Sequence, residues 1–337
     1  MLRPKCSLLP VMHTHVSCAR SGLGRGEACG ILCQKEYRAR MRGPTTHTQE
    51  TFVRILSAIA VAALMLNTPV LAADIAGTLK TIKDTGVIKL GFLSESVPFS
   101  YADVDGTPRG YSPDLCLRAA TGIQEQLGLE KLDVQWVPVT LETRFDAVKT
   151  GAIDLECGIT TNTLSRQKDV DFTVMTWIDG ANFLVRDSSP YRTLSDLAGK
   201  KIAVIPNTTT VGALKQALEK SYINAEIVLV QGHSEGLEGL NKGTVDAYAS
   251  DQTVLIGLAV AVSKSLKVRL GDKQLSYEPY GLMLRKNDQD FRQAVNTVLA
   301  RLYRSGQIAQ IYDRWFGKLG KPNEFLVLMY QLNALPE

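Results

Sequence analysis

Four polar residues follow segments whose apolar pattern predicts strands, and together they offer the groups that hold a zwitterion. In chain order they are Thr161, Arg166, Thr209 and Asp251. A guanidinium, a hydroxyl and the N-terminus of a helix bind a carboxylate, and an aspartate binds an ammonium group. We therefore predict a binding site for an L-amino acid.

A simpler interpretation stays open for each of these residues by itself. Asp251 and Asn207 stand where helices are expected to begin, so their side chains could satisfy backbone N–H groups instead of a ligand. Arg166 could be a solvated cation after a turn. The argument for a site rests on the joint occurrence of these residues at strand ends.

The surrounding sequence alternates predicted strands and helices. The expected strands are 87–92, 132–137, 153–157, 201–205, 227–230 and 245–249. This order predicts an α/β fold in which mostly parallel sheets carry helices on their faces. We expect a first lobe made of 76–177 plus 278–337 and a second lobe, 181–274, inserted within it. The two strands of the hinge are expected near 177–181 and 272–276, and the cleft between the lobes is the expected ligand site.

Charge is unevenly distributed along the 337 residues. The chain has 38 basic and 34 acidic side chains, of which nine basic and three acidic ones lie in 1–72. The remainder has 29 basic and 31 acidic side chains, a net charge of −2. This balance gives no support to nucleic-acid binding.

Residues 41–72 have the features of a secretory signal peptide. An apolar core of twelve residues, 55–66, follows Arg54 and precedes small residues that end at Ala72. The core is too short to span a bilayer, so we predict cleavage near Ala72 and a soluble, exported, periplasmic protein.

Residues 1–40 precede this signal and show no sustained apolar periodicity. We predict that they are a disordered or non-native extension and that translation begins at Met41. Cys29 and Cys33, with His13 and His15, could form a metal cluster, but their spacing is loose and we predict neither a metal nor a cofactor.

Two cysteines remain after the predicted cleavage, Cys116 and Cys157. Export to an oxidising compartment permits a disulfide between them. Two buried thiols are the alternative, because sequence does not give the distance between their Cα atoms.

The chain resembles the family 3 periplasmic solute-binding proteins of amino-acid ABC transporters, and most of all their glutamate/aspartate-binding branch. The resemblance covers roughly 76–335. The segments that carry it are Glu156–Lys168, Val97–Tyr101, Gly110–Ser112, Thr208–Thr209, Tyr280–Lys286 and Trp315–Phe316. It implies a two-lobed, type II periplasmic binding protein fold with a two-strand hinge.

The resemblance also implies roles for single residues. Arg166 and Thr209 would hold the ligand carboxylate, and Thr161 and Asp251 would hold its ammonium group. Arg144 and His233 would contact the ligand side chain.

Three positions depart from the pattern of acidic-ligand relatives. Leu93 stands where they have an arginine, and Leu141 and Ile159 stand where they have hydroxyls. A pocket that has lost three polar groups is less suited to a second carboxylate. We expect glutamate, aspartate or their amides first, and a larger apolar side chain second.

The expected function is capture of a free L-amino acid by cleft closure, without catalysis, and delivery to an ABC permease in the inner membrane. We expect a monomer. Two alternatives remain: a cyclohexadienyl dehydratase-like enzyme on the same fold, which turnover of arogenate or prephenate would establish, and an exported ligand sensor that docks on a receptor.

Overall fold

A computed structural model describes residues 75–336 of the chain. The predicted signal peptide, its cleavage site, the extension 1–40 and the candidate cluster of Cys29, Cys33, His13 and His15 all lie outside these residues. From residue 75 to residue 336, no helix combines the length and the apolar character that crossing a membrane requires.

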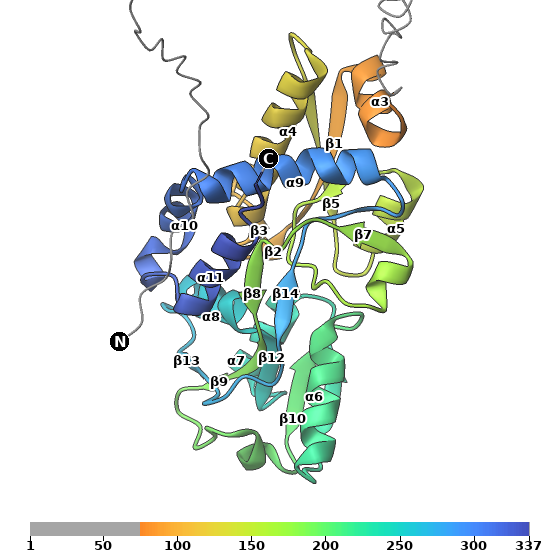
Figure 1. Ribbon diagram of the computed structural model, residues 1–337. Helices are drawn as coiled ribbons and strands as arrows, with labels where there is room; N and C mark the ends of the chain where they lie inside the picture. The colour runs from red at the N-terminus through yellow and green to blue at the C-terminus, as the bar shows by residue number, and fades with distance from the viewer. Residues whose placement is uncertain (1–74, 337) are drawn as a thin grey trace, which may run out of the picture. The chain divides into compact units, whose positions relative to one another are not determined.

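The first sheet has five strands and forms the core of the first lobe (Figure 1). In spatial order they are β5 (Asp133–Val139), β1 (Val87–Leu93), β6 (Leu155–Glu156), β15 (Met283–Arg285) and β7 (Val170–Phe172). A small second sheet of this lobe contains β2 (Glu95–Ser96), β3 (Ser100–Ala102) and β4 (Pro108–Arg109). Five of the seven residues of β1 are buried, which explains why its sequence is apolar except for the exposed Lys89.

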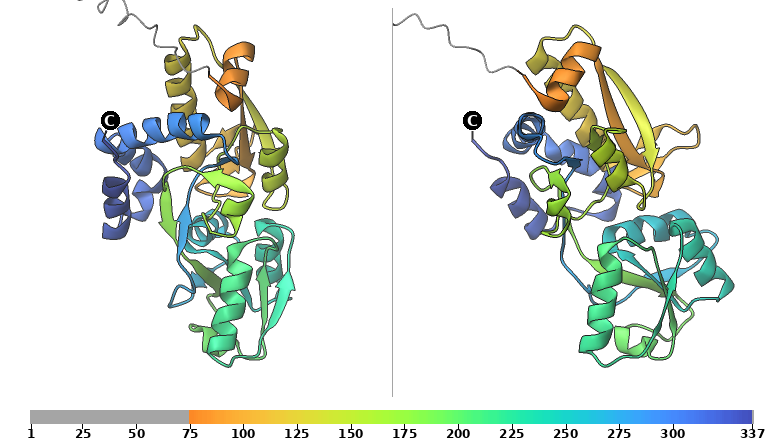
Figure 2. Two further views of the ribbon diagram at one scale, coloured as in Figure 1. Left: turned by 45° about the vertical axis from the view of Figure 1, so that its right-hand side comes forward. Right: turned by 90° about the vertical axis from the view of Figure 1, so that its right-hand side faces the viewer.

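Helices from both ends of the described chain pack in this lobe. They are α3 (Gly77–Thr85), α4 (Tyr111–Leu127), α5 (Arg144–Thr150), α9 (Gln289–Arg304), α10 (Ile308–Phe316) and α11 (Glu324–Leu332), with short 3₁₀ turns η1 (Arg166–Lys168) and η3 (Gly317–Leu319). Figure 2 shows the blue C-terminal helices beside the yellow and orange N-terminal elements. The chain therefore leaves this lobe and returns to it.

The second lobe is built from the intervening segment. Its strands, in spatial order, are β11 (Glu226–Leu229), β10 (Lys201–Val204), β12 (Ala247–Asp251), β9 (Ala181–Arg186) and β13 (Val268–Leu270). Its helices are the 3₁₀ turn η2 (Leu194–Leu197), α6 (Thr209–Lys220), α7 (His233–Lys242) and α8 (Gln252–Val262).

Both five-stranded sheets are more mixed than the predicted mostly parallel ones. β1 is parallel to β5 and β6, and β10 is parallel to β11 and β12, but β15 and β9 run antiparallel to their neighbours. The strands β9 and β15 directly follow the segments that pass between the lobes. They therefore enter their sheets from the opposite end to the strands of the βαβ units.

The two connecting strands pair with each other, but one of them differs from the prediction. β8 (Trp177–Asp179) lies where the first hinge strand was expected, whereas its partner is β14 (Glu278–Tyr280) and not the segment 272–276. Residues 272–276 instead run beside the start of β9, where the Leu275 amide donates to the Ala181 carbonyl. Figure 1 shows β8 and β14 side by side.

An aromatic cluster packs around Trp177, at the start of β8, and Tyr280, at the end of β14. The rings of Trp177 and Phe316 are 4.4 Å apart, and Phe99 lies 5.1 Å from Trp177 and 5.5 Å from Tyr280. Buried aromatic pairs add to the stability that their burial gives. Because the Tyr280 ring is packed in this cluster, the position of its hydroxyl is fixed.

A disulfide joins Cys116 of α4 to Cys157 at the end of β6, with their Cα atoms 6.1 Å apart. The bond closes a loop whose ends are 41 positions apart in the sequence. It links the helix that covers the first sheet to the segment that precedes Thr161.

We predict that the double variant Cys116→Ser/Cys157→Ser loses about 2 to 4 kcal/mol of unfolding free energy, because the unfolded chain gains the freedom of that loop. Denaturant unfolding of both proteins measures the loss. Adding a thiol reductant should destabilise the wild type and leave the double variant unchanged. Equal stability of the two oxidised proteins would contradict the prediction.

Candidate functional site

Asp251 lies at the carboxyl end of β12, at the position that precedes α8. Its side chain is 6% exposed and makes no capping bond to that helix. Instead its two oxygens accept hydrogen bonds from the Tyr280 hydroxyl at 2.5 Å and from the Thr210 hydroxyl at 3.2 Å. The Asp251 side chain therefore does not cap α8. Asn207 is not the cap of α6 either, since Thr208 takes that position.

The other three residues of the predicted zwitterion site lie close to one another. Thr161 is buried, and its hydroxyl oxygen is 3.2 Å from that of Thr209, the first residue of α6. The Arg166 guanidinium donates to the Thr161 carbonyl at 2.8 Å and to the Asn207 carbonyl at 3.4 Å. The guanidinium also lies 5.3 Å from the ring centre of Phe145, within cation–π range. Residues of the first lobe thus meet residues of the second.

Three residues that the sequence analysis did not select surround Asp251. The Tyr280 hydroxyl lies between Asp251 and Asp179, 3.4 Å from the nearer Asp179 oxygen. Asp179 is paired in register with Glu278 on the neighbouring connecting strand, and both side chains are buried. For Tyr280 the available signal was its place in the segment Tyr280–Lys286, and for Asp179 and Glu278 it was an acidic residue in or near the predicted hinge, which is too common to be selective.

Burial disfavours the ionised forms of Asp179 and Asp251. It raises the pKa of Asp179 to about 7, with the Asp251 charge adding to the effect. It raises the pKa of Asp251 to about 6, with Glu278 adding to the shift, while the Tyr280 and Thr210 hydroxyls and Arg166 oppose it. Burial also lowers the pKa of Arg166, against the attraction of Glu278 and Asp251. A positive group placed at Asp251 would stabilise the carboxylate form of the cluster.

Three further predicted residues line a cavity of about 370 Å³ between the lobes. Leu93 and Leu141 come from the first lobe and His233 from the second. Val139 and Ile205 add apolar surface to the same walls. The rest of the lining is more polar and includes Glu95, Thr140 and Glu235, so the walls are apolar only in part.

His233 begins α7 and is 2% exposed. Its Nδ1 lies 2.6 Å from the Tyr248 hydroxyl and its Nε2 lies 3.3 Å from the Ser96 hydroxyl of the first lobe. Burial lowers the pKa of His233 to about 4, against the opposite effect of Glu95, so the ring is neutral at neutral pH.

Arg144 and Ile159 are predicted ligand contacts that are not part of the cavity lining. Arg144 begins α5, is 2% exposed and donates from Nε to the Thr160 hydroxyl at 2.9 Å and from a terminal nitrogen to the Leu141 carbonyl. Ile159 is 6% exposed in the core of the first lobe.

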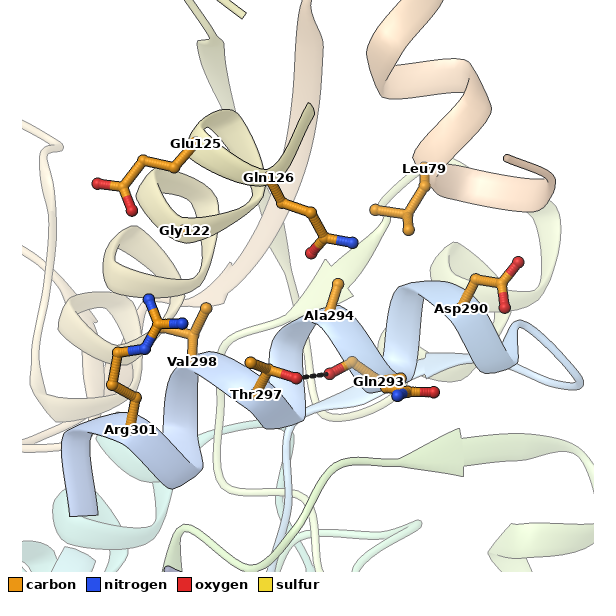
Figure 3. A pocket seen from close by; sticks show the side chains of 10 residues that line it. All are labelled: Leu79, Gly122, Glu125, Gln126, Asp290, Gln293, Ala294, Thr297, Val298 and Arg301. Atoms are coloured by element: carbon orange, nitrogen blue, oxygen red, sulfur yellow. Dashed lines mark hydrogen bonds between the residues drawn. The ribbon is translucent and has the colours of Figure 1, made fainter. Parts of the chain in front are cut away.

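A second depression lies on the far side of the first lobe, between α3, α4 and α9 (Figure 3). Its lining includes Gln126, Gln293 and Val298, and the Thr297 hydroxyl donates to the Gln293 carbonyl at 2.9 Å. Its described lining contains none of the predicted ligand contacts. Across 75–336, no group of three or more His, Cys, Asp or Glu side chains is arranged to hold a metal ion.

The buried acids Asp179 and Asp251 make the stability of the ligand-free protein depend on pH. Unfolded aspartates have a pKa of about 3.9, so between that value and about 7 the folded state holds more protons than the unfolded chain. The unfolding free energy contributed by the cluster therefore falls as pH rises through this interval. Asp179→Asn should remove much of that fall and raise ligand-free stability at pH 8 by at least about 1 kcal/mol, with little change near pH 4.5.

Denaturant unfolding at several pH values, without ligand, measures this effect. Glu142→Gln, which removes an exposed charge, is the matched control and should follow the wild type. Parallel pH profiles for Asp179→Asn and wild type would contradict the interpretation.

Comparisons with known proteins show which family this chain resembles. Residues 88–318 match the family described as bacterial extracellular solute-binding proteins, family 3. An L-glutamate/L-aspartate-binding protein of Pseudomonas aeruginosa is 36% identical over 262 residues, which cover 77% of this chain and 87% of the relative. A glutamate/aspartate import solute-binding protein of Salmonella typhimurium is 31% identical over 239 residues, which cover 71% of this chain and 79% of the relative.

One solved structure has a fold similar to that of this chain. An ancestral amino-acid-binding protein, described as a precursor of cyclohexadienyl dehydratase, has a TM-score of 0.62 and 28% identity, covering 71% of this chain and 100% of that one. The predicted two-lobed, type II periplasmic binding protein fold is confirmed. The chain belongs to the family 3 bacterial extracellular solute-binding proteins.

Proposed function

We propose that this protein captures a free L-amino acid in the cleft between its lobes and delivers it to an ABC permease. The observation that carries the proposal is that Thr161 and Arg166 of one lobe contact Thr209 and Asn207 of the other. Beside them the Tyr280 hydroxyl donates to the buried carboxylate of Asp251. A guanidinium and hydroxyls at one end and a buried carboxylate at the other are what an α-amino acid requires.

Each end of the ligand has its own partners in this proposal. Arg166 and Thr209 hold the α-carboxylate, helped by the N-terminus of the twelve-residue helix α6. Thr161 and Asp251 hold the α-ammonium group. Because these residues come from both lobes, the ligand binds the closed arrangement better than an open one and shifts the population toward it.

The lobes, in this proposal, are 76–177 plus 278–337 and 181–274, and the paired strands β8 and β14 act as the hinge. Charge-assisted hydrogen bonds contribute about 1.5 to 3 kcal/mol each. A few of them account for micromolar binding, which corresponds to about −8 kcal/mol.

We also propose where the protein acts and which partner it meets. Cleavage near Ala72 would release an exported, monomeric protein into the periplasm, where an inner-membrane permease receives the closed form. The relatives from Pseudomonas aeruginosa and Salmonella typhimurium are named for binding glutamate and aspartate. We propose binding without turnover, although one structural neighbour is described as a precursor of a dehydratase.

A thermal-shift screen of the twenty amino acids, on protein that starts at Ala73, tests the central proposal. A ligand that binds only the folded state raises the melting temperature, so at least one amino acid should do so in proportion to its concentration. No response to any of them would contradict capture of an amino acid. Turnover of prephenate or arogenate would establish the enzyme alternative.

Arg166→Ala should weaken binding of the best ligand by at least about 2 kcal/mol, because it removes one partner of a buried charge pair. Calorimetric titration measures the change. Lys168→Ala is the matched control, since Lys168 is an exposed cation of the same 3₁₀ turn. Unchanged affinity in Arg166→Ala would remove Arg166 from the site.

A further inference from the structure

A second set of contacts joins the two lobes, apart from the proposed grip on the amino acid. Glu95, in β2 of the first lobe, accepts hydrogen bonds from Ser234, in α7 of the second lobe. Its Oε1 lies 3.1 Å from the Ser234 hydroxyl oxygen, and its Oε2 lies 3.3 Å from the Ser234 amide nitrogen. Both residues line the cavity, so this contact joins the lobes at the cavity wall.

The Glu95 carboxylate takes the place of a cap that α7 lacks in its own lobe. The cap position is Gly232, which has no side chain to accept from the helix N–H groups. The acid of the first turn, Glu235, accepts from the Gln231 amide, which precedes the helix. The first N–H groups of a helix have no partner within it, and the helix dipole favours a negative charge there. Glu95 supplies both the acceptor and the charge from the opposite lobe.

The next residue, Ser96, continues the contact between the lobes. Its hydroxyl lies 3.3 Å from Nε2 of His233, whose Nδ1 lies 2.6 Å from the Tyr248 hydroxyl. All three side chains are buried. A neutral imidazole donates from one nitrogen and accepts at the other. A buried chain of hydrogen bonds therefore runs from the first lobe into the second.

A third contact places α8 of the second lobe against the same segment. A Cβ atom built on Gly257 of α8 would lie 2.5 Å from the Val97 carbonyl oxygen and 2.9 Å from Cδ of Pro98. No side chain fits at this distance, so glycine permits the close approach of the two lobes. Residues 95–98 thus contact α7 and α8 together, and we call these four residues the docking segment.

We propose that the docking segment stabilises the closed arrangement of the lobes independently of the ligand, and that Glu95 does so by capping α7 across the cleft. This inference rests on the proposed function and adds to it a residue that sets how tightly every amino acid is held. When a ligand needs the closed arrangement, its apparent Kd rises as the population of that arrangement falls. Glu95 is therefore a positioning residue, which changes all affinities by one factor and leaves their order unchanged.

Glu95→Ala removes the cap and should raise the Kd of each amino acid that binds by about threefold to tenfold, by the same factor for all. The factor is modest because Glu95 is exposed and water screens its charge. Calorimetric titration measures the Kd values. A changed order of preference would make Glu95 a direct ligand contact and would overturn the inference. Tighter binding of acidic amino acids, as expected if Glu95 only repels them, would overturn it too.

Glu235→Ala is the matched control for charge. It removes another exposed acid of the same cavity and the same end of α7, but its hydrogen bond to Gln231 stays within the second lobe. It should change each Kd by less than about twofold. Equal effects of Glu235→Ala and Glu95→Ala would overturn the inference, since a cap across the cleft would then not be needed to explain them.

Gly257→Ala tests the docking segment by adding a clash instead of removing an attraction. Alanine favours a helix more than glycine does, so melting curves should show a folded protein. The added methyl group collides with the Val97 carbonyl when the lobes are closed, so each Kd should rise at least about fivefold, as overpacking predicts. Unchanged affinities would overturn the role of the docking segment.

A measurement without ligand separates this inference from the proposed function. Val104→Cys and Lys220→Cys place one dye on an exposed position of each lobe, on protein that starts at Ala73, in which Cys116 and Cys157 are bonded to each other. By single-molecule energy transfer, Glu95→Ala should lower the closed fraction about threefold or more.

Equal closed fractions in the labelled wild type and in labelled Glu95→Ala would overturn the inference. If no amino acid binds, the proposed function fails, and the closed fraction alone then decides whether Glu95 holds the lobes together. If amino acids bind and the fractions are equal, the proposed function stands and the inference fails.

Discussion

The hydrogen bond from the Tyr280 hydroxyl to the buried carboxylate of Asp251 is the contact on which the proposed site depends. It joins a connecting strand to the end of a strand in the second lobe. Tyr280 also forms a β-bridge with Thr161, so the same residue contacts both residues that are proposed to hold the ammonium group. The aromatic cluster around Phe99 and Trp177 holds the Tyr280 ring in place.

Around this contact the structure concentrates negative charge where the lobes are connected. Asp179, Asp251 and Glu278 are all buried there. Carboxylates removed from water favour either a proton or a cation, and an amino acid supplies a cation as its ammonium group. In the proposed site, recognition of the ammonium group would therefore depend on residues at or near the paired strands β8 and β14.

Different residues surround the cavity that is proposed to hold the ligand side chain. Leu93, Leu141 and Val139 form apolar parts of the cavity walls, and the described lining also includes Glu95 and Glu235 but no lysine or arginine. Selectivity in such a cavity arises from the cost of removing a ligand side chain from water as well as from direct contacts. Substitution of a few residues on this wall can therefore change the preferred side chain without disturbing the grip on the ammonium and carboxylate groups.

Much of this site could be predicted from local sequence, because its residues are the polar side chains that directly follow apolar strands. Thr161, Arg166, Thr209 and Asp251 were identifiable on that basis, and the two-lobed fold followed from the alternation of strands and helices and from a resemblance to a family. The pairing of Glu278–Tyr280, in place of 272–276, with β8 was not predictable, since a strand register depends on contacts between segments about 100 residues apart.

The sequence by itself determined which groups are available to bind an amino acid, since composition and strand ends are local properties. Only the tertiary structure decided how they are used. It showed that Asp251 accepts a hydrogen bond from Tyr280 instead of capping α8, and that Cys116 and Cys157 are bonded. The reason is physical: burial and proximity set the charge state and partners of a side chain, and both arise when distant segments pack together.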